Sequence, residues 1–162
     1  MTERSPGPSK QQDSRIAPAA VDDTARAVID TLSAAGYVAF LNGGCVRDLL
    51  MGQAPKDWDI VTDAGPDEVT GLFEHTIPVG AQFGIVRVRI EDREFEVARF
   101  RREGPYSDGR RPDHVDLAGP RQDAQRRDFT INGMFYDPRA DEVLDFVGGQ
   151  TDLEAGRIRA IG

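Results

Sequence analysis

Residues 37–61, YVAFLNGGCVRDLLMGQAPKDWDIV, contain the pattern from which the architecture follows. The apolar run YVAFL (37–41) is typical of a buried strand, and the Asn-Gly-Gly turn after it leads into a short helix over residues 45–51. That helix ends at Gly52, and DWDIV (57–61) is typical of a second strand. The stretch therefore predicts a strand, a glycine turn, a helix and a strand in direct succession.

The rest of the chain predicts an α+β domain. Apolar positions at helical spacing indicate a helix over residues 21–35, and Pro66 with two acidic residues behind it starts another helix that runs to Phe73. Further strands are expected over residues 85–90, 95–100, 143–147 and 157–162, the first two as a β-hairpin. We expect a mixed, mainly antiparallel sheet of about five strands with helices packed on one side.

Composition restricts the function classes. The chain has 162 residues and a formal net charge of −8, so a basic surface that coats nucleic acid is excluded and any such contact must be local. No apolar run is long enough for a membrane span, and the N-terminus lacks the apolar stretch of a secretory signal. The single cysteine excludes an internal disulfide framework, so we expect a cytoplasmic protein. Residues 1–18 are expected to form a disordered tail before a domain over residues 19–162.

The strongest chemical signal is the pair Asp57 and Asp59. Because side chains alternate along a strand, both carboxylates would share one face while Trp58 points into the other layer. A divalent cation would offset their repulsion, and carboxylates are typical Mg²⁺ ligands. Glu96, in the second strand of the expected hairpin, could add a third carboxylate that completes the site or orients a water. The alternatives are an exposed acidic pair on an edge strand and a glutamate on a solvated sheet face.

Asn42-Gly43-Gly44 is a candidate phosphate-binding turn. Glycines allow a close approach of the backbone, and the helix that follows offers free N–H groups. Arg47, one turn into that helix, could pair with a phosphate. An ordinary tight turn is the alternative, although the position just before the acidic strand favours binding.

Three other residues, one cysteine and two histidines, have reactive or metal-binding side chains. Cys45 at a helix start could be a reactive thiol, but burial as a small apolar residue is favoured. His75 and His114 have no second ligand at metal-binding spacing, which argues against a zinc site.

Four segments in this order resemble the catalytic head of the bacterial class II tRNA nucleotidyltransferase and poly(A) polymerase family, which includes the CCA-adding enzymes. They are GGCVRDLLMG…KDWDI (43–60), EVARFRREGPYSDGRRP (96–112), RRDFTINGMFYD (126–137) and DFVGGQTDLEAGRIRAIG (145–162). The resemblance implies a nucleotidyltransferase fold. It also implies Mg²⁺-dependent, two-metal transfer of a nucleoside monophosphate from a nucleoside triphosphate to an RNA 3′-hydroxyl.

Carried over by position, the resemblance implies that Asp57 and Asp59 are the metal ligands and catalytic residues. Glu96 is the third predicted catalytic residue, and its agreement with the family pattern is only loose. The residues implied in nucleotide binding are Gly43, Gly44, Arg47, Arg127, Asp128 and Asn132, with Asp128 at the sugar. Within the long segment after residue 100, Arg110 and Arg111 are implied to meet substrate phosphates.

The expected activity is addition of CCA to tRNA 3′ ends, with ATP and CTP as substrates and tRNA as partner. Addition of poly(A) to RNA is one alternative, and a nucleotide-binding head that is inactive alone is another. An enzyme that adenylylates an antibiotic would also use paired aspartates but leaves RRDFTIN unexplained. In the family, base selection and RNA binding lie in helical domains beyond this head, so we expect them to be supplied in cis or in trans. Gly133 stands where many members have alanine.

Overall fold

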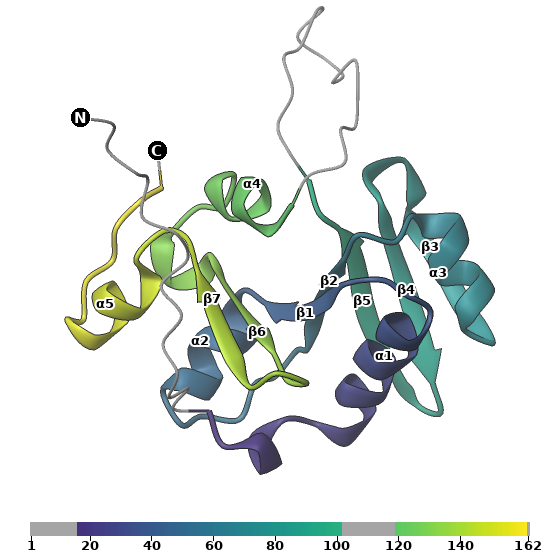
Figure 1. The fold of residues 1–162 in the computed structure, drawn as a ribbon, viewed down its shortest axis with the longest axis horizontal. Coiled ribbons are helices and arrows are strands. Elements are labelled where there is room, and N and C mark those ends of the chain that lie inside the picture. Colours follow the sequence, from purple (N-terminus) through teal and green to yellow (C-terminus); the bar gives the residue numbers. More distant parts are fainter. Residues whose placement is uncertain (1–15, 102–118, 162) are drawn as a thin grey trace, which may run out of the picture.

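The computed structural model describes residues 16–101 and 119–161, which form one sheet with helices around it (Figure 1). Seven strands lie in the described part of the chain, in the spatial order β3-β4-β5-β2-β1-β6-β7. Their bounds are β1 Ala39–Asn42, β2 Asp59–Thr62, β3 His75–Gly80, β4 Ile85–Ile90, β5 Arg93–Arg99, β6 Met134–Asp137 and β7 Glu142–Asp145. Neighbouring strands are antiparallel except β2 and β5, which are parallel, so the expected mixed, mainly antiparallel sheet is confirmed.

The expected strand count of about five is too low. β3 was missed because Pro78 interrupts its pattern and because, as an edge strand, it has mostly exposed side chains. The strand expected over residues 157–162 is wrong, because this segment makes one isolated bridge, between Phe129 and Ala160. Two backbone bonds support that bridge, from Thr130 N to Arg159 O (3.0 Å) and from Ile161 N to Asp128 O (3.0 Å).

Five α-helices surround the sheet in the described ranges. They are α1 Asp23–Ala34, α2 Gly44–Leu50, α3 Pro66–Leu72, α4 Pro120–Gln125 and α5 Gly149–Glu154. Asp22 caps α1 by accepting a hydrogen bond from Ala25 N (2.8 Å). At α3, Glu68 accepts from Gly65 N (2.7 Å) just ahead of Pro66. The first three helices agree with the sequence pattern, whereas α4 and α5 are too short for a clear periodicity.

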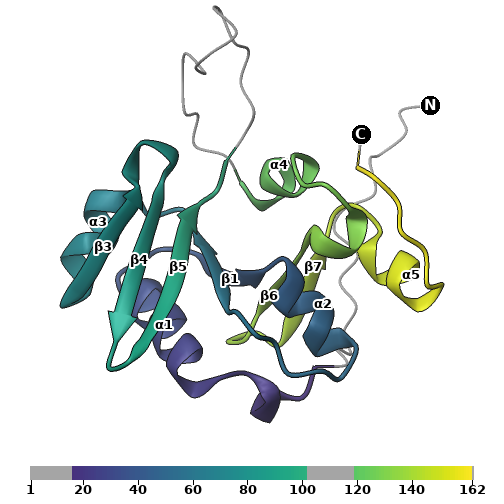
Figure 2. The same ribbon diagram turned by 180° about the vertical axis from the view of Figure 1, so that it is seen from behind.

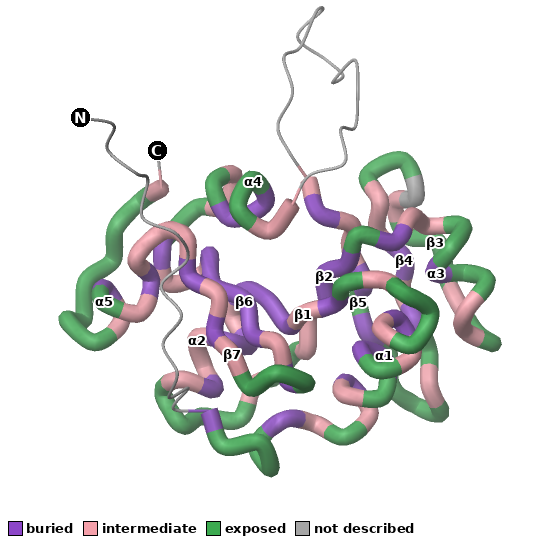
Figure 3. Tube along the Cα trace, in the orientation of Figure 1, coloured by how far each residue is buried: buried purple, intermediate pink, exposed green. Residues whose placement is uncertain are grey.

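The two faces of the sheet have different cores. Apolar side chains of α1, α2 and α3 join the main core with Leu41, Ile60 and Val97 from the sheet. A smaller cluster on the opposite face contains Phe135 and the Ala124 side chain of α4. The expectation of helices on one side therefore holds for α1–α3 and not for α4. Figure 3 shows buried positions along the central strands β1, β2 and β6.

At the N-terminal end of the described chain, Ile16 is buried in the main core, so packing begins ahead of residue 19. Residues 1–15, which make up most of the expected tail, lie outside the described residues. Among the residues that are described, no helix is long and apolar enough to cross a membrane.

Candidate active site

Two carboxylates lie side by side where β2 and β5 run parallel. Asp59 is the first residue of β2, and the register places it opposite Glu96. Asp57 precedes the strand in an exposed bend, so the strand expected from residue 57 begins two residues later. Trp58 packs against the main core, away from the carboxylates, as the alternation predicts. Burial raises the pKa of Asp59, the charges of Glu96 and Asp57 raise it further, and Arg127 opposes them.

The donor set at this point fits a hard divalent cation. In the described part of the chain, no three His, Cys, Asp or Glu side chains converge closely enough to hold a metal ion unaided. Mg²⁺ does not require such a cage, because it commonly takes one or two carboxylates and completes its shell with substrate phosphates and water. The mutual repulsion that raises the Asp59 pKa is the repulsion that a bound cation would relieve.

The glycine turn lies at the end of β1, beside the first residue of β2. Gly43 has φ 74° and ψ −139°, a conformation that side chains other than glycine's hydrogen rarely allow, and it precedes α2 directly. A Cβ on Gly44 would lie 3.3 Å from Arg47 Nη2, and one on Gly43 would lie 3.8 Å from Arg127 Nη1. The two glycines therefore allow two guanidinium groups to approach the turn.

Hydrogen bonds join α2 to the segment RRDFTIN. Arg47 Nη1 donates to Asn132 Oδ1 (2.7 Å), and Asn132 Nδ2 donates to Asp128 Oδ1 (3.3 Å). The 3₁₀ turn Thr130–Asn132 holds the asparagine in place for both contacts. Residues implied in nucleotide binding but separated by more than eighty positions are thus in direct contact.

Arg127 is held by two buried polar residues: Asp123, which the sequence analysis did not single out, and Asn42, the first residue of the predicted phosphate-binding turn. Asp123 is fully buried, and its Oδ2 accepts from Arg127 Nη2 (2.7 Å) while its Oδ1 accepts from Arg101 N (2.9 Å). Asn42 is also buried. In the amide orientation that satisfies its neighbours, its Nδ2 donates to the Asp59 carbonyl oxygen (3.1 Å) and its Oδ1 accepts from Arg127.

Some signal for these two residues was present in the sequence. A polar residue ends the otherwise apolar strand at Asn42, and Asp123 precedes Arg127 by four positions, the spacing of neighbours on a helix face. Neither pattern reveals burial, which depends on how α4 packs against the sheet.

The Cys45 side chain is buried, as favoured from the sequence, and its thiol donates to the Asn42 carbonyl oxygen (3.1 Å). Burial raises its pKa to about 12. Arg110, Arg111 and His114 lie outside the described residues.

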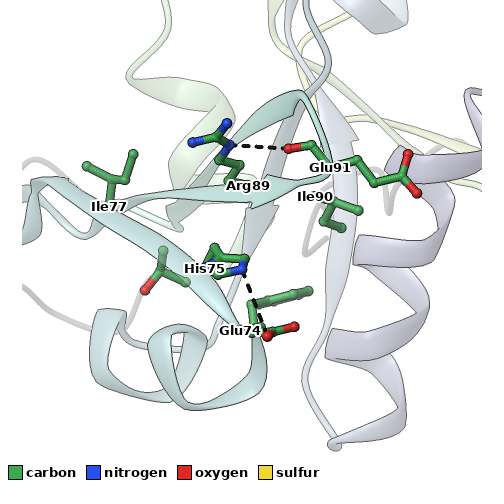
Figure 4. Close-up of a pocket in the computed structure, with 8 residues that line it drawn as sticks. Glu74, His75, Ile77, Arg89, Ile90 and Glu91 are labelled. Atoms are coloured by element: carbon green, nitrogen blue, oxygen red, sulfur yellow. Dashed lines mark hydrogen bonds and ion pairs between the residues drawn. The ribbon is translucent and has the colours of Figure 1, made fainter.

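Two hollows on the surface of the described residues can be compared with the predicted site. One, of about 690 Å³, is lined by four carboxylates and three cations, which are Asp57, Asp59, Glu94 and Glu96 and Lys56, Arg87 and Arg93. The other, of about 750 Å³, lies where β3 begins and β4 ends, between Glu74, His75 and Arg89 (Figure 4). No residue predicted for the site lines this second hollow, and its His75–Glu74 pair is solvent-exposed. The first hollow is therefore the one next to the chemistry, although it is slightly smaller.

Carboxylates on parallel strands beside a glycine turn place the fold in the nucleotidyltransferase class. The fold is similar to that of a solved tRNA nucleotidyltransferase in complex with a primer tRNA and an incoming ATP analog. It has a TM-score of 0.66 and 28% identity, over 83% of this chain and 39% of that one. The chain belongs to the poly A polymerase head domain family, whose profile matches residues 39–159.

Two further relatives support this membership. A CCA-adding enzyme of Bacillus pumilus is 44% identical over 136 residues, which are 83% of this chain and 34% of that enzyme. The crystal structure of the Bacillus stearothermophilus CCA-adding enzyme in complex with CTP has a TM-score of 0.74 and 34% identity, over 84% of this chain and 32% of that one. The chain spans about a third of the length of the curated relatives it matches.

Proposed function

We propose that this chain is the catalytic head of an enzyme that adds nucleotides from CTP and ATP to the 3′ end of tRNA. The observation that carries the proposal is the placement of Asp59 opposite Glu96, next to the Gly43 turn. The CTP complex and the enzyme name of the similar proteins support this substrate class. Base selection and most RNA binding are assigned to parts of the whole enzyme beyond this head.

Asp57 and Asp59 are proposed to hold Mg²⁺, with Glu96 beside them. When bound, the cation would supply charge neutralisation at the α-phosphate and activation of the RNA 3′-hydroxyl. The protein contributes position: β2 and β5 fix the Asp59 and Glu96 side chains on one face, and Asp57 lies in the exposed bend just ahead of β2. A hard oxygen donor set of this size leaves coordination positions for substrate phosphates.

The nucleotide is proposed to lie on the other side of Asp59, at the turn of Gly43 and Gly44. Arg47 would pair with the triphosphate, since its guanidinium lies over Gly44 and is one-third exposed. The remaining contacts are proposed for Arg127, Asp128, Asn132 and the two arginines Arg110 and Arg111. Asn132 bonds both Arg47 and Asp128, so phosphate and sugar contacts would be set by one network.

Calorimetric titration of Mg²⁺ with ATP, and of Mg²⁺ with CTP, into this chain tests the proposal. We expect binding that needs the cation, treats both nucleotides alike and is lost in Asp59→Ala. The matched control is Asp92→Ala, which deletes an exposed carboxylate in the turn between β4 and β5. This variant should bind as the wild type does. Undiminished binding by a folded Asp59→Ala variant would refute the metal and nucleotide assignment.

Poly(A) addition is the second candidate, favoured by the description of the matching family. Both activities use the same chemistry in the head, so an assay that distinguishes them needs the whole enzyme. Products made from a tRNA lacking its terminal nucleotides should end after C, C and A for the first activity and continue as A for the second.

A further inference from the structure

The groove of about 690 Å³ beside the carboxylates contains cationic side chains that the nucleotide site does not use. Resting on the proposed function, we propose that this groove receives the RNA strand whose 3′ end is extended, and that Lys56 and Arg87 bind its phosphates. Both side chains line the groove together with Asp57, Asp59 and Glu96. Carboxylates and phosphate-binding cations therefore share one hollow.

Strand register gives this groove a direct connection to the acidic site. Asp59 lies opposite Glu96, Glu96 opposite Arg87, and Arg87 opposite Ile77, so one row of side chains crosses four strands on a single face. Figure 2 shows β3, β4 and β5 in front of α1 and α3, with no described helix in front of these three strands. A chain lying along the row would pass from the solvent-exposed Ile77 to the carboxylates.

The three cations that line the groove differ in how strongly they are already engaged. Arg93 Nη1 donates to Asp22 Oδ1 (2.5 Å), and its guanidinium stacks 5.0 Å from the centre of the Phe95 ring. Arg87 pairs with Glu94 at 3.4 Å, and both side chains are about 40% exposed, so the pair is weak and a phosphate can displace it. Lys56 has no ion-pair partner among the described residues. Lys56 and Arg87 are thus the two cations available to a ligand.

The chemistry of the transfer assigns the groove to RNA rather than to the triphosphate. In an in-line displacement, the attacking hydroxyl and the departing pyrophosphate lie on opposite sides of the phosphorus atom. In the sheet, β2 lies between β1, which leads into the glycine turn, and β5, which leads toward Arg87. If the triphosphate occupies the turn, the RNA 3′ end must arrive from the side of β5 and β4.

The groove is lined by four carboxylates (Asp57, Asp59, Glu94 and Glu96) and three cations (Lys56, Arg87 and Arg93), so its lining is not basic as a whole. Attraction of the RNA phosphates therefore depends on individual cations. The chain is acidic overall, with a net charge of −8, so a general attraction to RNA is absent and local cations must supply it. Lys56 and Arg87 lie next to the carboxylates. Phosphates bound there would hold the RNA backbone beside the site of the transfer.

Amide and side-chain NMR of this chain tests the proposal with two probes in parallel: a short single-stranded RNA ending in CC, and a non-hydrolysable ATP analog with Mg²⁺. We expect the RNA to shift the Lys56 and Arg87 signals, and the nucleotide to shift those of Gly44 and Arg47. Nucleotide shifts at Gly44 with no RNA shifts in the groove would overturn the RNA assignment and leave the proposed function standing. Nucleotide shifts at Lys56 and Arg87 would show a triphosphate groove instead. No nucleotide shift anywhere would refute the proposed function.

The double variant Lys56→Gln/Arg87→Gln gives the quantitative form of the test. RNA binding should weaken several-fold, and the slope of log K against log salt should fall by about 0.7 for each lost phosphate contact, while nucleotide affinity stays unchanged. Arg139→Gln, which removes an exposed cation whose ion-pair partner among the described residues is Asp30, is the control. An unchanged salt slope in the folded double variant contradicts the assignment.

Discussion

Asp123→Asn should destabilise the fold strongly, although it changes only one atom of the side chain. In the wild type, the fully buried carboxylate accepts from Arg127 (2.7 Å), Arg126 (3.2 Å) and the Arg101 backbone (2.9 Å). The amide keeps one acceptor but turns an NH₂ group toward a guanidinium, and two cations lose their counter-charge. Removing one partner of a buried pair costs about 3–5 kcal/mol. Arg126 and Arg127 keep about a fifth of their side-chain surface exposed, so we expect a loss of about 3 kcal/mol, the lower end of that range.

Urea unfolding followed by circular dichroism measures this loss, and thermal unfolding should show a midpoint lower by about 6–12 °C. Asp30→Asn is the matched control, because Asp30 is half exposed and its ion pair with Arg139 spans 3.9 Å. It should change the free energy of unfolding by less than about 0.5 kcal/mol. A loss below about 1 kcal/mol in Asp123→Asn, with the native spectrum kept, would refute the view that Asp123 is the essential counter-charge of the two arginines.

Three further predictions concern packing, pH and reactivity. Gly149→Ala should lower the free energy of unfolding by about 1–3 kcal/mol, because the added Cβ would lie 2.3 Å from the Thr130 carbonyl oxygen. Gly71→Ala is the control: open space surrounds Gly71, so this change should be neutral or stabilising. Asp59→Asn should raise the thermal midpoint at pH 7. Because the folded-state pKa of Asp59 lies above that of an ordinary aspartate, ionisation destabilises the native state, and the gain should shrink as the pH falls through the raised pKa. An equal gain at all pH values would contradict this. Cys45, with a pKa of about 12, should resist a thiol reagent at pH 8 until urea unfolds the chain.

The helices and strands that the sequence predicted well are those with a long local pattern. The helix expected over residues 21–35 appears as Asp23–Ala34, and the expected hairpin appears as β4 and β5. Elements stabilised mainly by their neighbours were missed. β3 is an edge strand that contains Pro78, and α5 begins at Gly149, where helix propensity is poor.

The position of Gly133 shows the same limit at the level of one residue. The sequence alone gives no reason for a glycine at this position. In the structure, an added Cβ would lie 3.0 Å from Val147 Cγ2 and 3.2 Å from Ile161 Cδ1, so a larger residue here would require these two side chains to shift.

The sequence by itself determined which residues are candidates for the chemistry and which face of each strand they occupy. Alternation places Glu96 opposite to Phe95 and Val97, and the glycine turn precedes the acidic strand in the chain. Only the tertiary structure decided that β2 and β5 pair in parallel, because strand pairing over more than thirty residues leaves no local pattern. Only the tertiary structure also shows that Asn42 and Asp123 are buried partners of Arg127. A polar group removed from water needs hydrogen-bond partners, and which partners it meets depends on how the elements pack.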